Sequence, residues 1–442
     1  YKRQVFSLFI LLLKPLYADL KVRELKSHDG IEFWLVQEKS IPFIALEIRF
    51  RGGTSMDEHT TRGAVSFMTA MLEEGSGELN DQEFLKARDS IAASFNFDAS
   101  RDSLSVSARF LSNNKSEAVE LLKGALTRPR FDQEAIERVR RQIISLIESN
   151  QKNQKKLAQT KLFELTFGNH IYSSSDIGTL KNIKSISRMD LIEAHHVAIN
   201  KDRMSVSIVG DISEDQASIM LDTLFEDLPL ASKPLPQSAN INLDLGTVLV
   251  DYPSPQSVAF FALKGIKRND KDFFAAFIMN HILGGGGFNS RLMREIREKR
   301  GLTYSINTSL AQYDHAELFL GMFQSSNGKI SKAIEILKKE LSLMASKGVT
   351  IEELEAAKKF LIGAYPLRFD GNERIAKILA GMQFIGLNKD YMVYRNEMVN
   401  AVKPADITRV AKRLLSEKGF TLVVVGRPDD CLLYTSTLPT MC

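Results

Sequence analysis

The sequence predicts an α+β protein made of two homologous domains. Two stretches carry most of this prediction, SVSIVGDIS at 205–213 and TLVVVGRPD at 421–429, which begin 216 positions apart. Each contains the β-branched run of a buried strand and reaches a Val-Gly pair. Long helical patterns alternate with strand patterns without a strict βαβ order, which favours helices packed on a mixed or antiparallel sheet.

The elements before these two strands follow the same order in both halves. Each half begins with a strand, a turn that contains proline and a second strand, and then a helix. The predicted strands are 33–37 and 44–50, matched by 247–251 and 258–264, and the predicted helices are 63–74 and 272–283. The helix ends LEEG and LGGG are 211 positions apart. Offsets that agree this closely indicate a duplicated domain of about 200 residues.

Long helical patterns follow in each half, at 132–167 and 328–348. The second has apolar residues at helical spacing, with Lys and Glu outside the stripe: Ile330, Ile334, Leu337, Leu341 and Met344. Between the halves, the segment PLASKPLPQSANINLD has the proline content of a linker. We therefore expect an N-terminal domain at 19–231, a linker at 232–243 and a C-terminal domain at 244–429.

The two ends of the chain differ in composition from its body. Residues 1–18 contain Lys2 and Arg3, then a nine-residue apolar run and a small residue, Ala18, which is the layout of a secretory signal. A short membrane anchor or a mis-assigned start is the alternative, although the run is far shorter than the ~20 residues of a membrane span. Residues 430–442 follow an abrupt change of composition, and we expect a non-native tail there.

The amino-acid composition limits the classes of protein to which this chain can belong. With 44% hydrophobic and 25% charged residues the chain is globular, and a formal charge of +4 gives no reason to expect nucleic acid. Both cysteines lie in the expected tail, so the body has neither a disulfide framework nor a thiolate zinc site. We expect an exported, periplasmic protein with no stable membrane span.

The seven histidines show no metal-binding spacing. His195 and His196 are adjacent, so on a helix they diverge by about 100° and cannot chelate one ion from the same face. Roles on the helix surface or in packing are favoured for this pair. The sequence contains no His-x-x-Glu-His, no His-Glu-x-x-His and no Gly-x-Ser-x-Gly nucleophile motif.

The segment 284–310 carries the densest chemical signal. GGGGFNS at 284–290 fits a structural turn or a loop that a peptide passes against, and the residues alone favour neither. Tyr304 is expected to begin a strand after Gly301. Five cations precede this glycine on a predicted helix, and composition alone favours a solvated basic face: Arg291, Arg294, Arg297, Lys299 and Arg300.

These motifs resemble those of the insulinase, pitrilysin and mitochondrial-processing-peptidase family. The order FNSRL…REKRGLTYS after a glycine-rich loop is rather specific, and the half-ends SIVG and VVVG agree with it. In the first half, GGTSMDEHTTRGAVSFMTAMLEEGS and FDQEAIERVRRQIISLIESN fit the same family. The resemblance covers residues 20 to 429 and implies two α+β domains that form half of a clam-shell around a peptide.

The resemblance implies that the zinc motif is lost in this chain. Active members carry His-x-x-Glu-His on the helix that contains GAVSFMTAMLEEG, and here the three positions are occupied by Ser66, Thr69 and Ala70. A third ligand, a glutamate in active members, falls near Leu146, with Glu148 the nearest carboxylate. We therefore expect no zinc in this chain and no peptide hydrolysis by the chain alone.

The same resemblance implies that the second half keeps residues used in trans. An Arg and a Tyr seven residues later reach the scissile region in related enzymes, and they match Arg297 and Tyr304. Asn96 matches a strand region that binds the peptide as an added strand. We expect a subunit that binds peptide and completes the active site of a partner, a zinc-bearing homologous subunit. The alternatives are a peptide-binding or scaffold protein and an active zinc peptidase with unusual ligands.

Overall fold

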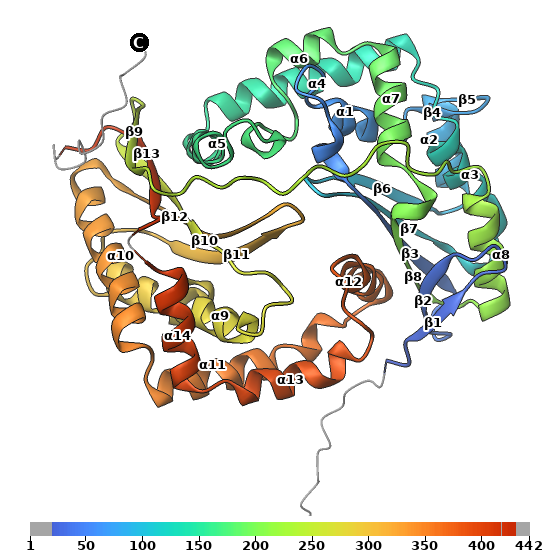
Figure 1. Cartoon of the computed structure of the whole chain (residues 1–442). Helices are drawn as coiled ribbons and strands as arrows, with labels where there is room; N and C mark the ends of the chain where they lie inside the picture. The colour runs from blue at the N-terminus through green and yellow to red at the C-terminus, as the bar shows by residue number, and fades with distance from the viewer. Residues whose placement is uncertain (1–19, 417, 430–442) are drawn as a thin grey trace, which may run out of the picture.

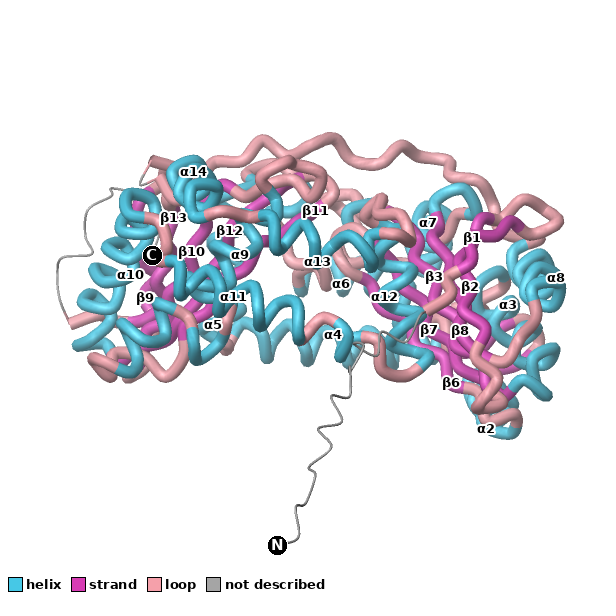
Figure 2. The backbone as a smooth tube through the Cα atoms, turned by 90° about the horizontal axis from the view of Figure 1, so that it is seen from below, coloured by secondary structure: helices cyan, strands magenta, loops and turns pink. Residues whose placement is uncertain are grey.

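The computed structural model describes residues 20–416 and 418–429, and the expected signal segment and tail lie outside these ranges. The chain forms two helix-covered sheets at opposite ends of the molecule (Figure 2). The extended segment between α8 (Glu214–Phe225) and β9 (Gly246–Asp251) crosses from one half to the other. No helix within the described ranges combines the length and hydropathy required to cross a membrane.

The first sheet has the order β1-β2-β8-β3-β7-β6. Strand β2 is parallel to β8, and the other neighbours are antiparallel. The sheet is therefore mixed, as expected. Its strands are β1 (Arg23–Lys26), β2 (Glu32–Gln37), β3 (Phe43–Arg51), β6 (Ser94–Ala99), β7 (Ser103–Leu111) and β8 (Met204–Gly210).

The second sheet repeats this arrangement in the order β9-β13-β10-β12-β11, with β9 parallel to β13. If β1 is set aside, the first sheet has the equivalent order β2-β8-β3-β7-β6. The predicted pair of homologous α+β domains is confirmed by this match. The remaining strands are β10 (Gln256–Lys264), β11 (Ile306–Tyr313), β12 (Ala316–Ser326) and β13 (Thr421–Gly426), and a small hairpin is formed by β4 (Gly75–Ser76) and β5 (Leu79–Asn80).

Helices cover both faces of each sheet (Figure 1). The predicted helix at 132–167 is interrupted at Lys152 and Asn153, where Asn153 accepts hydrogen bonds from the first amides of the next helix. In the first half the helices are α1 (Ala64–Ala70), α2 (Asp81–Ser90), α3 (Lys115–Thr127), α4 (Gln133–Gln151), α5 (Gln154–Phe167), α6 (Leu180–Ser185), α7 (Arg188–Ala198) and α8. In the second half they are α9 (Phe273–Asn280), α10 (Asn327–Lys347), α11 (Ile351–Gly363), α12 (Asn372–Phe384), α13 (Tyr391–Ala401) and α14 (Pro404–Leu414).

The two halves exchange one helix each. Helix α5 of the first half packs on the second sheet, where Leu162 and Phe163 join Val258 and Val423 in one buried cluster. Helix α12 of the second half packs on the first sheet and covers the face that looks toward the second half, as Figure 1 shows. Neither exchange follows from the sequence pattern, because an apolar helix face does not say which sheet it will cover.

Candidate functional site

The vacated zinc positions lie on α1, which is firmly held at its N-terminus. Asp57 is buried and accepts hydrogen bonds from the backbone amides of Gly63 and Val65, both at 2.8 Å. It also pairs with Arg62 at 3.1 Å, which in turn contacts Asp176 at 3.1 Å. Burial raises the pKa of Asp57, against the attraction of Arg62. Asp57 and Arg62 belong to the loop that leads into α1, whereas Asp176 comes from a segment more than 100 residues later, so its place in this network could not be predicted from the sequence.

The side chains at the three motif positions cannot act as zinc ligands. Ser66 donates its hydroxyl to the carbonyl of Asp176 at 2.8 Å, and Thr69 donates to the carbonyl of Val65 at 2.7 Å. Ala70 is exposed and has no ligand atom. Both hydroxyls are thus occupied by backbone acceptors, and zinc prefers imidazole, thiolate or carboxylate ligands. The residues present do not fit a zinc ion.

The region expected to supply the third zinc ligand has no carboxylate at the required position. Leu146 lies on α4 and is 49% exposed, and Glu148 is exposed on the same helix. Two residues apart on a helix, their side chains diverge by about 200°, so Glu148 cannot take the place of Leu146. Within residues 20–416 and 418–429, His, Cys, Asp and Glu side chains form no group of three that could hold a metal ion.

In the second half, Arg297 and Tyr304 lie side by side. The Arg297 guanidinium carbon is 5.2 Å from the centre of the Tyr304 ring and 4.6 Å from that of Phe288. Arg297 is half-buried in a π-helix, Met293–Glu298, and Tyr304 is 82% exposed. Gly301 has a φ of 58°, a left-handed turn that glycine adopts without strain. This turn returns the chain so that Tyr304 meets Arg297.

The placement of Tyr304 corrects one expectation. Tyr304 does not begin a strand, because β11 starts two residues later at Ile306. The residue lies instead on the loop that closes the turn, where no strand partner restrains its ring. The first residue of the glycine-rich segment has a structural role. A Cβ atom at Gly284 would lie 2.6 Å from the Thr308 hydroxyl, so this glycine permits close packing against β11.

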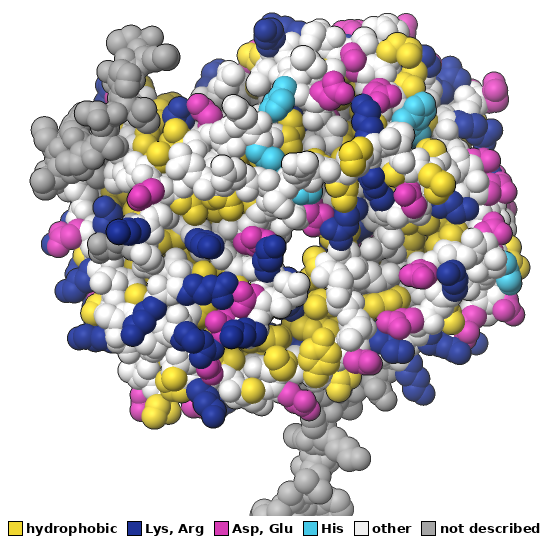
Figure 3. Space-filling model, viewed as in Figure 1, with side chains coloured by type: hydrophobic (Ala, Val, Ile, Leu, Met, Phe, Trp, Pro, Cys, Tyr) yellow, Lys and Arg dark blue, Asp and Glu magenta, His cyan; other side chains and the backbone are white. Residues whose placement is uncertain are grey.

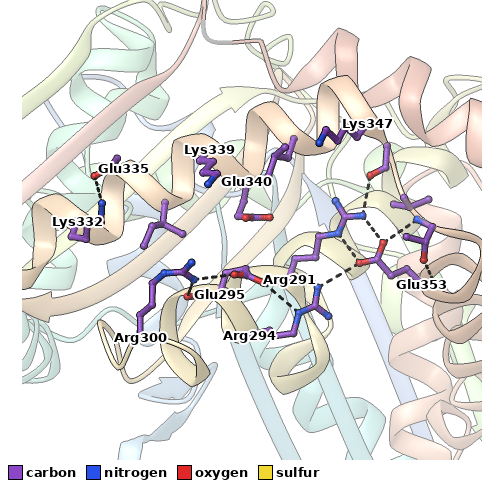
Figure 4. A pocket seen from close by; sticks show the side chains of 15 residues that line it. Arg291, Arg294, Glu295, Arg300, Lys332, Glu335, Lys339, Glu340, Lys347 and Glu353 are labelled. Carbon is purple, nitrogen blue, oxygen red and sulfur yellow. Dashed lines mark hydrogen bonds and ion pairs between the residues drawn. The ribbon is translucent and has the colours of Figure 1, made fainter.

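The other four cations of the basic cluster form ion pairs with two carboxylates, as Figure 4 shows for three of them. Arg291 forms a bidentate pair with Glu353, and Arg294 lies within 3.7 Å of the same carboxylate. Lys299 and Arg300 both bind Glu295, at 2.7 and 2.9 Å. Partial burial would raise the pKa of Glu295, but these two hydrogen bonds hold it at about 2.

Arg297 is the exception in this cluster. Within the described ranges it forms no ion pair, and its guanidinium group lies against the rings of Phe288 and Tyr304. Composition alone favoured a uniform solvated face, whereas the structure divides the cluster into four paired cations and one held by aromatic rings. An arginine held in this way keeps its N–H donors available for a carbonyl or carboxylate.

Tyr304 borders a hollow of about 420 Å³ to which both halves contribute. Lys155 comes from α5, the helix donated by the first half, while Gln256, Asn307, Gln324 and Lys329 come from the second. Amide and ammonium groups of this kind suit backbone carbonyls better than apolar side chains. Among the described residues, no hydrogen bond, ion pair or ring contact joins Arg297 or Tyr304 to Ser66, Thr69 or Ala70.

Asn96 lies on β6, at the outer edge of the first sheet, and is exposed. Its strand neighbours Phe95 and Phe97 pack in the core beneath α1. Since side chains alternate along a strand, Asn96 points to the opposite face, toward α12, where Glu373 and Lys377 lie beside it. Its side chain is therefore on the far side of the sheet from Ser66, although the backbone edge of β6 remains open.

The two adjacent histidines have packing and surface positions. His195 is 6% exposed and donates from Nε2 to the Leu126 carbonyl at 2.8 Å. Burial lowers the pKa of His195 to about 4, so it is neutral at physiological pH. His196 is exposed on the same helix.

Comparison with known proteins identifies the family. Residues 34–179 match the insulinase family (peptidase family M16), and residues 185–361 match the peptidase M16 inactive domain. A non-peptidase homologue, YmxG from Helicobacter pylori, is 30% identical over 77% of this chain and 78% of its own length. The chain belongs to the M16 peptidase family.

Two further M16 comparisons bear on its class. A crystal structure of a peptidase M16 inactive domain from Pseudomonas fluorescens matches with a TM-score of 0.85 and 26% identity, over 92% of this chain and 98% of that one. An uncharacterized zinc protease YmxG from Bacillus subtilis is 20% identical over 90% of this chain and 96% of its own length. Together with the substituted positions on α1, the non-peptidase homologue and the inactive-domain structure support a non-catalytic M16 member.

Proposed function

We propose that this protein is a non-catalytic M16 subunit that pairs with a zinc-bearing homologue and contributes Arg297 and Tyr304 to the partner's active site. The observation that carries the proposal is the contrast between the two halves. Ser66 and Thr69 are satisfied by backbone carbonyls, whereas Arg297 has no carboxylate partner in the described ranges and Tyr304 is 82% exposed. The motif positions on α1 therefore offer no zinc ligand or general base, whereas Arg297 and Tyr304 are placed to contact a second molecule.

The chemistry of the pair would be electrostatic. The Tyr304 hydroxyl would donate a hydrogen bond to the oxyanion that develops during peptide hydrolysis, and Arg297 would hold a substrate carbonyl. Because the rings of Phe288 and Tyr304 already restrain the guanidinium, less side-chain entropy is lost when it binds. The general base and the metal would belong to the partner. We place this complex in the periplasm, in line with the signal-like residues 1–18.

The test is co-expression with an M16 homologue that carries the complete His-x-x-Glu-His motif, ideally one encoded by an adjacent gene. We expect Arg297→Ala and Tyr304→Phe each to lower kcat of the complex by roughly 10²- to 10³-fold, the usual effect of removing one oxyanion donor. Size-exclusion chromatography should show an unchanged complex, and the zinc content of the partner should not fall.

Lys299→Ala is the matched control, since Lys299 is an exposed cation on the same turn that binds Glu295. It should leave kcat within about twofold, as expected for a surface ion pair. If Arg297→Ala and Tyr304→Phe both retain the wild-type kcat in an intact complex, the proposed role is wrong.

A second candidate function is peptide binding without any contribution to catalysis. It is favoured by the open edge of β6, which could add a peptide as a further strand. Peptide affinity of the isolated protein that is unaffected by Tyr304→Phe, together with no effect of the protein on the partner's activity, would favour it. An active peptidase with unusual ligands would instead require stoichiometric zinc and inhibition by a chelator.

A further inference from the structure

A cavity of about 480 Å³ lies where α12 passes between the halves. Its walls come from α12, α9, α13, the loop after β10 and the short 3-10 turn Pro366–Arg368, and Arg49 reaches it from β3 of the first sheet. Ligand sites for small molecules typically measure about 300–1,000 Å³ and often lie at domain boundaries. The cavity therefore has a suitable size and position for a ligand.

The charge of the lining is of one sign. Six cations border the cavity and no Asp or Glu does: Arg49, Arg268, Arg368, Arg374, Lys377 and Arg395. Arg49 lies 3.4 Å from the buried Glu47. The other five form no ion pair with any described residue, in contrast to the paired cations around Glu295. Six like charges beside a single carboxylate repel one another, and an anion would relieve this repulsion.

Aromatic rings hold the innermost cations in place. The Arg268 guanidinium carbon is 3.9 Å from the centre of the Phe273 ring and 4.9 Å from that of Tyr391. Arg395 is only 4% exposed, lies 4.3 Å from the Tyr365 ring centre and donates to the Leu361 carbonyl at 2.9 Å. Such cation–π contacts restrain a guanidinium without neutralising its charge. A buried arginine beside no carboxylate is costly unless a counter-ion is supplied.

Donor groups in the cavity are free to bind. Arg268, Arg374 and Lys377 make no side-chain hydrogen bond to any residue in the described ranges. Glycine at 381 keeps the space beside Arg49 open, since a Cβ there would lie 3.2 Å from Arg49 Nη1. Apolar side chains, among them Ile378 and Leu387, complete the wall. The cavity thus offers guanidinium and ammonium donors beside aromatic and aliphatic surface.

We propose that this cavity binds a small organic anion, in which a phosphate or carboxylate is joined to an aromatic or apolar body. Guanidinium groups match the geometry of both acids, and the Phe273, Tyr365 and Tyr391 rings provide the surface for the body. Because Arg49 belongs to the first half and the other donors to the second, the ligand bridges the two halves. The site does not include Arg297 or Tyr304, so it stands apart from the proposed catalytic contribution.

The test is calorimetric titration of the full chain with phenyl phosphate at low ionic strength. We expect phenyl phosphate to bind at least tenfold more tightly than inorganic phosphate, which lacks the ring, and than benzyl alcohol, which lacks the charge. Arg268→Gln and Lys377→Gln should each weaken phenyl phosphate about tenfold, which is the loss of one charge-assisted hydrogen bond. Both side chains are at least partly exposed, so the variants should fold.

Arg300→Gln is the matched control, because Arg300 is an exposed cation bound to Glu295 outside the cavity. The affinity of this variant for phenyl phosphate should equal that of the wild-type protein. Equal affinities for phenyl phosphate and inorganic phosphate, or full affinity in both cavity variants, would overturn the proposal. Acetyl-Asp-Phe-amide provides a second arm: if it binds tenfold more tightly than both phenyl phosphate and benzoate, the occupant is a peptide segment and the assignment to a small anion is wrong.

Discussion

Burial decides how the two adjacent histidines of α7 differ. His195 is buried and donates a hydrogen bond from Nε2 to the Leu126 carbonyl, so its neutral ring has a packing role. His196, one residue on, is exposed. The same contrast separates Arg62, buried among two carboxylates, from Arg297, held by aromatic rings. At this scale a residue type has no fixed role until its surroundings are known.

The lowered pKa of His195 gives a dependence of stability on pH. Since its pKa is about 4 in the folded protein and about 6.5 in the unfolded chain, the unfolded chain binds more protons between these values. The free energy of unfolding should therefore fall as the pH is lowered through this window, by about 3 kcal/mol from His195 alone. Urea unfolding at pH 7 and pH 4.5 measures the change.

His195→Gln keeps a hydrogen-bond donor but cannot be protonated, so its stability should depend less steeply on pH over the same window. His196→Gln is the control and should follow the wild-type curve. A His195→Gln curve parallel to wild type would show that other groups produce the acid sensitivity.

At the scale of elements, α12 connects the two halves, because it belongs to the second half and packs on the first sheet. Ile375, Ala376, Leu379 and Met382 bury its apolar face against the first sheet. The Ser207 hydroxyl adds a hydrogen bond to the Ala376 carbonyl at 2.7 Å. Its opposite side borders the cationic cavity. One helix thus completes the core of one half and the ligand site that we propose between the halves.

Truncation of Leu379 tests how tightly α12 is docked. Leu379 is fully buried, and Leu379→Ala should lower the free energy of unfolding by about 2–5 kcal/mol through lost burial and the cavity left behind. Trp34, the single tryptophan of the chain, lies in the same cluster. Its fluorescence should shift to longer wavelength if the helix loosens.

Leu367→Ala removes the same atoms from a side chain that is 73% exposed, and it should change stability by less than about 0.5 kcal/mol. If the two variants lose stability equally, α12 does not depend on its contact with the first sheet.

At the scale of the whole molecule, the exchanged helices make the two halves depend on each other. Direct contacts add to this coupling. Arg51 of β3 binds both Asp314 and the Phe384 carbonyl, and Asp102 accepts from the Asp314 amide at 3.0 Å. An opening between the halves is visible in Figure 3, so the boundary is not packed along its whole length.

We therefore expect the chain to unfold in urea as a single cooperative unit. Trp34 reports on the first sheet and α12, while far-UV circular dichroism reports on all helices and strands. The two transitions should have coincident midpoints, since neither sheet keeps both faces covered when the other half unfolds. Midpoints that differ clearly, or a biphasic curve, would contradict this coupling.

Much of the fold could be predicted from the sequence. The offsets of 216 and 211 predicted the duplication, and the equivalent strand orders of the two sheets confirm it. These features are local, because strand and helix periodicity is written in neighbouring residues. The start of β11 after Tyr304 could not be predicted, since the left-handed turn at Gly301 shifts where pairing with β12 begins.

The sequence by itself determined which side chains occupy the motif positions: Ser66, Thr69 and Ala70 carry neither an imidazole nor a carboxylate, whatever the fold. Only the tertiary structure decided which of the clustered cations stay free, which sheet each exchanged helix covers, and that Arg49 meets Arg268 and Arg395 around one cavity. The physical reason is that ion pairs and helix packing depend on partners distant along the chain, which periodicity and spacing do not encode.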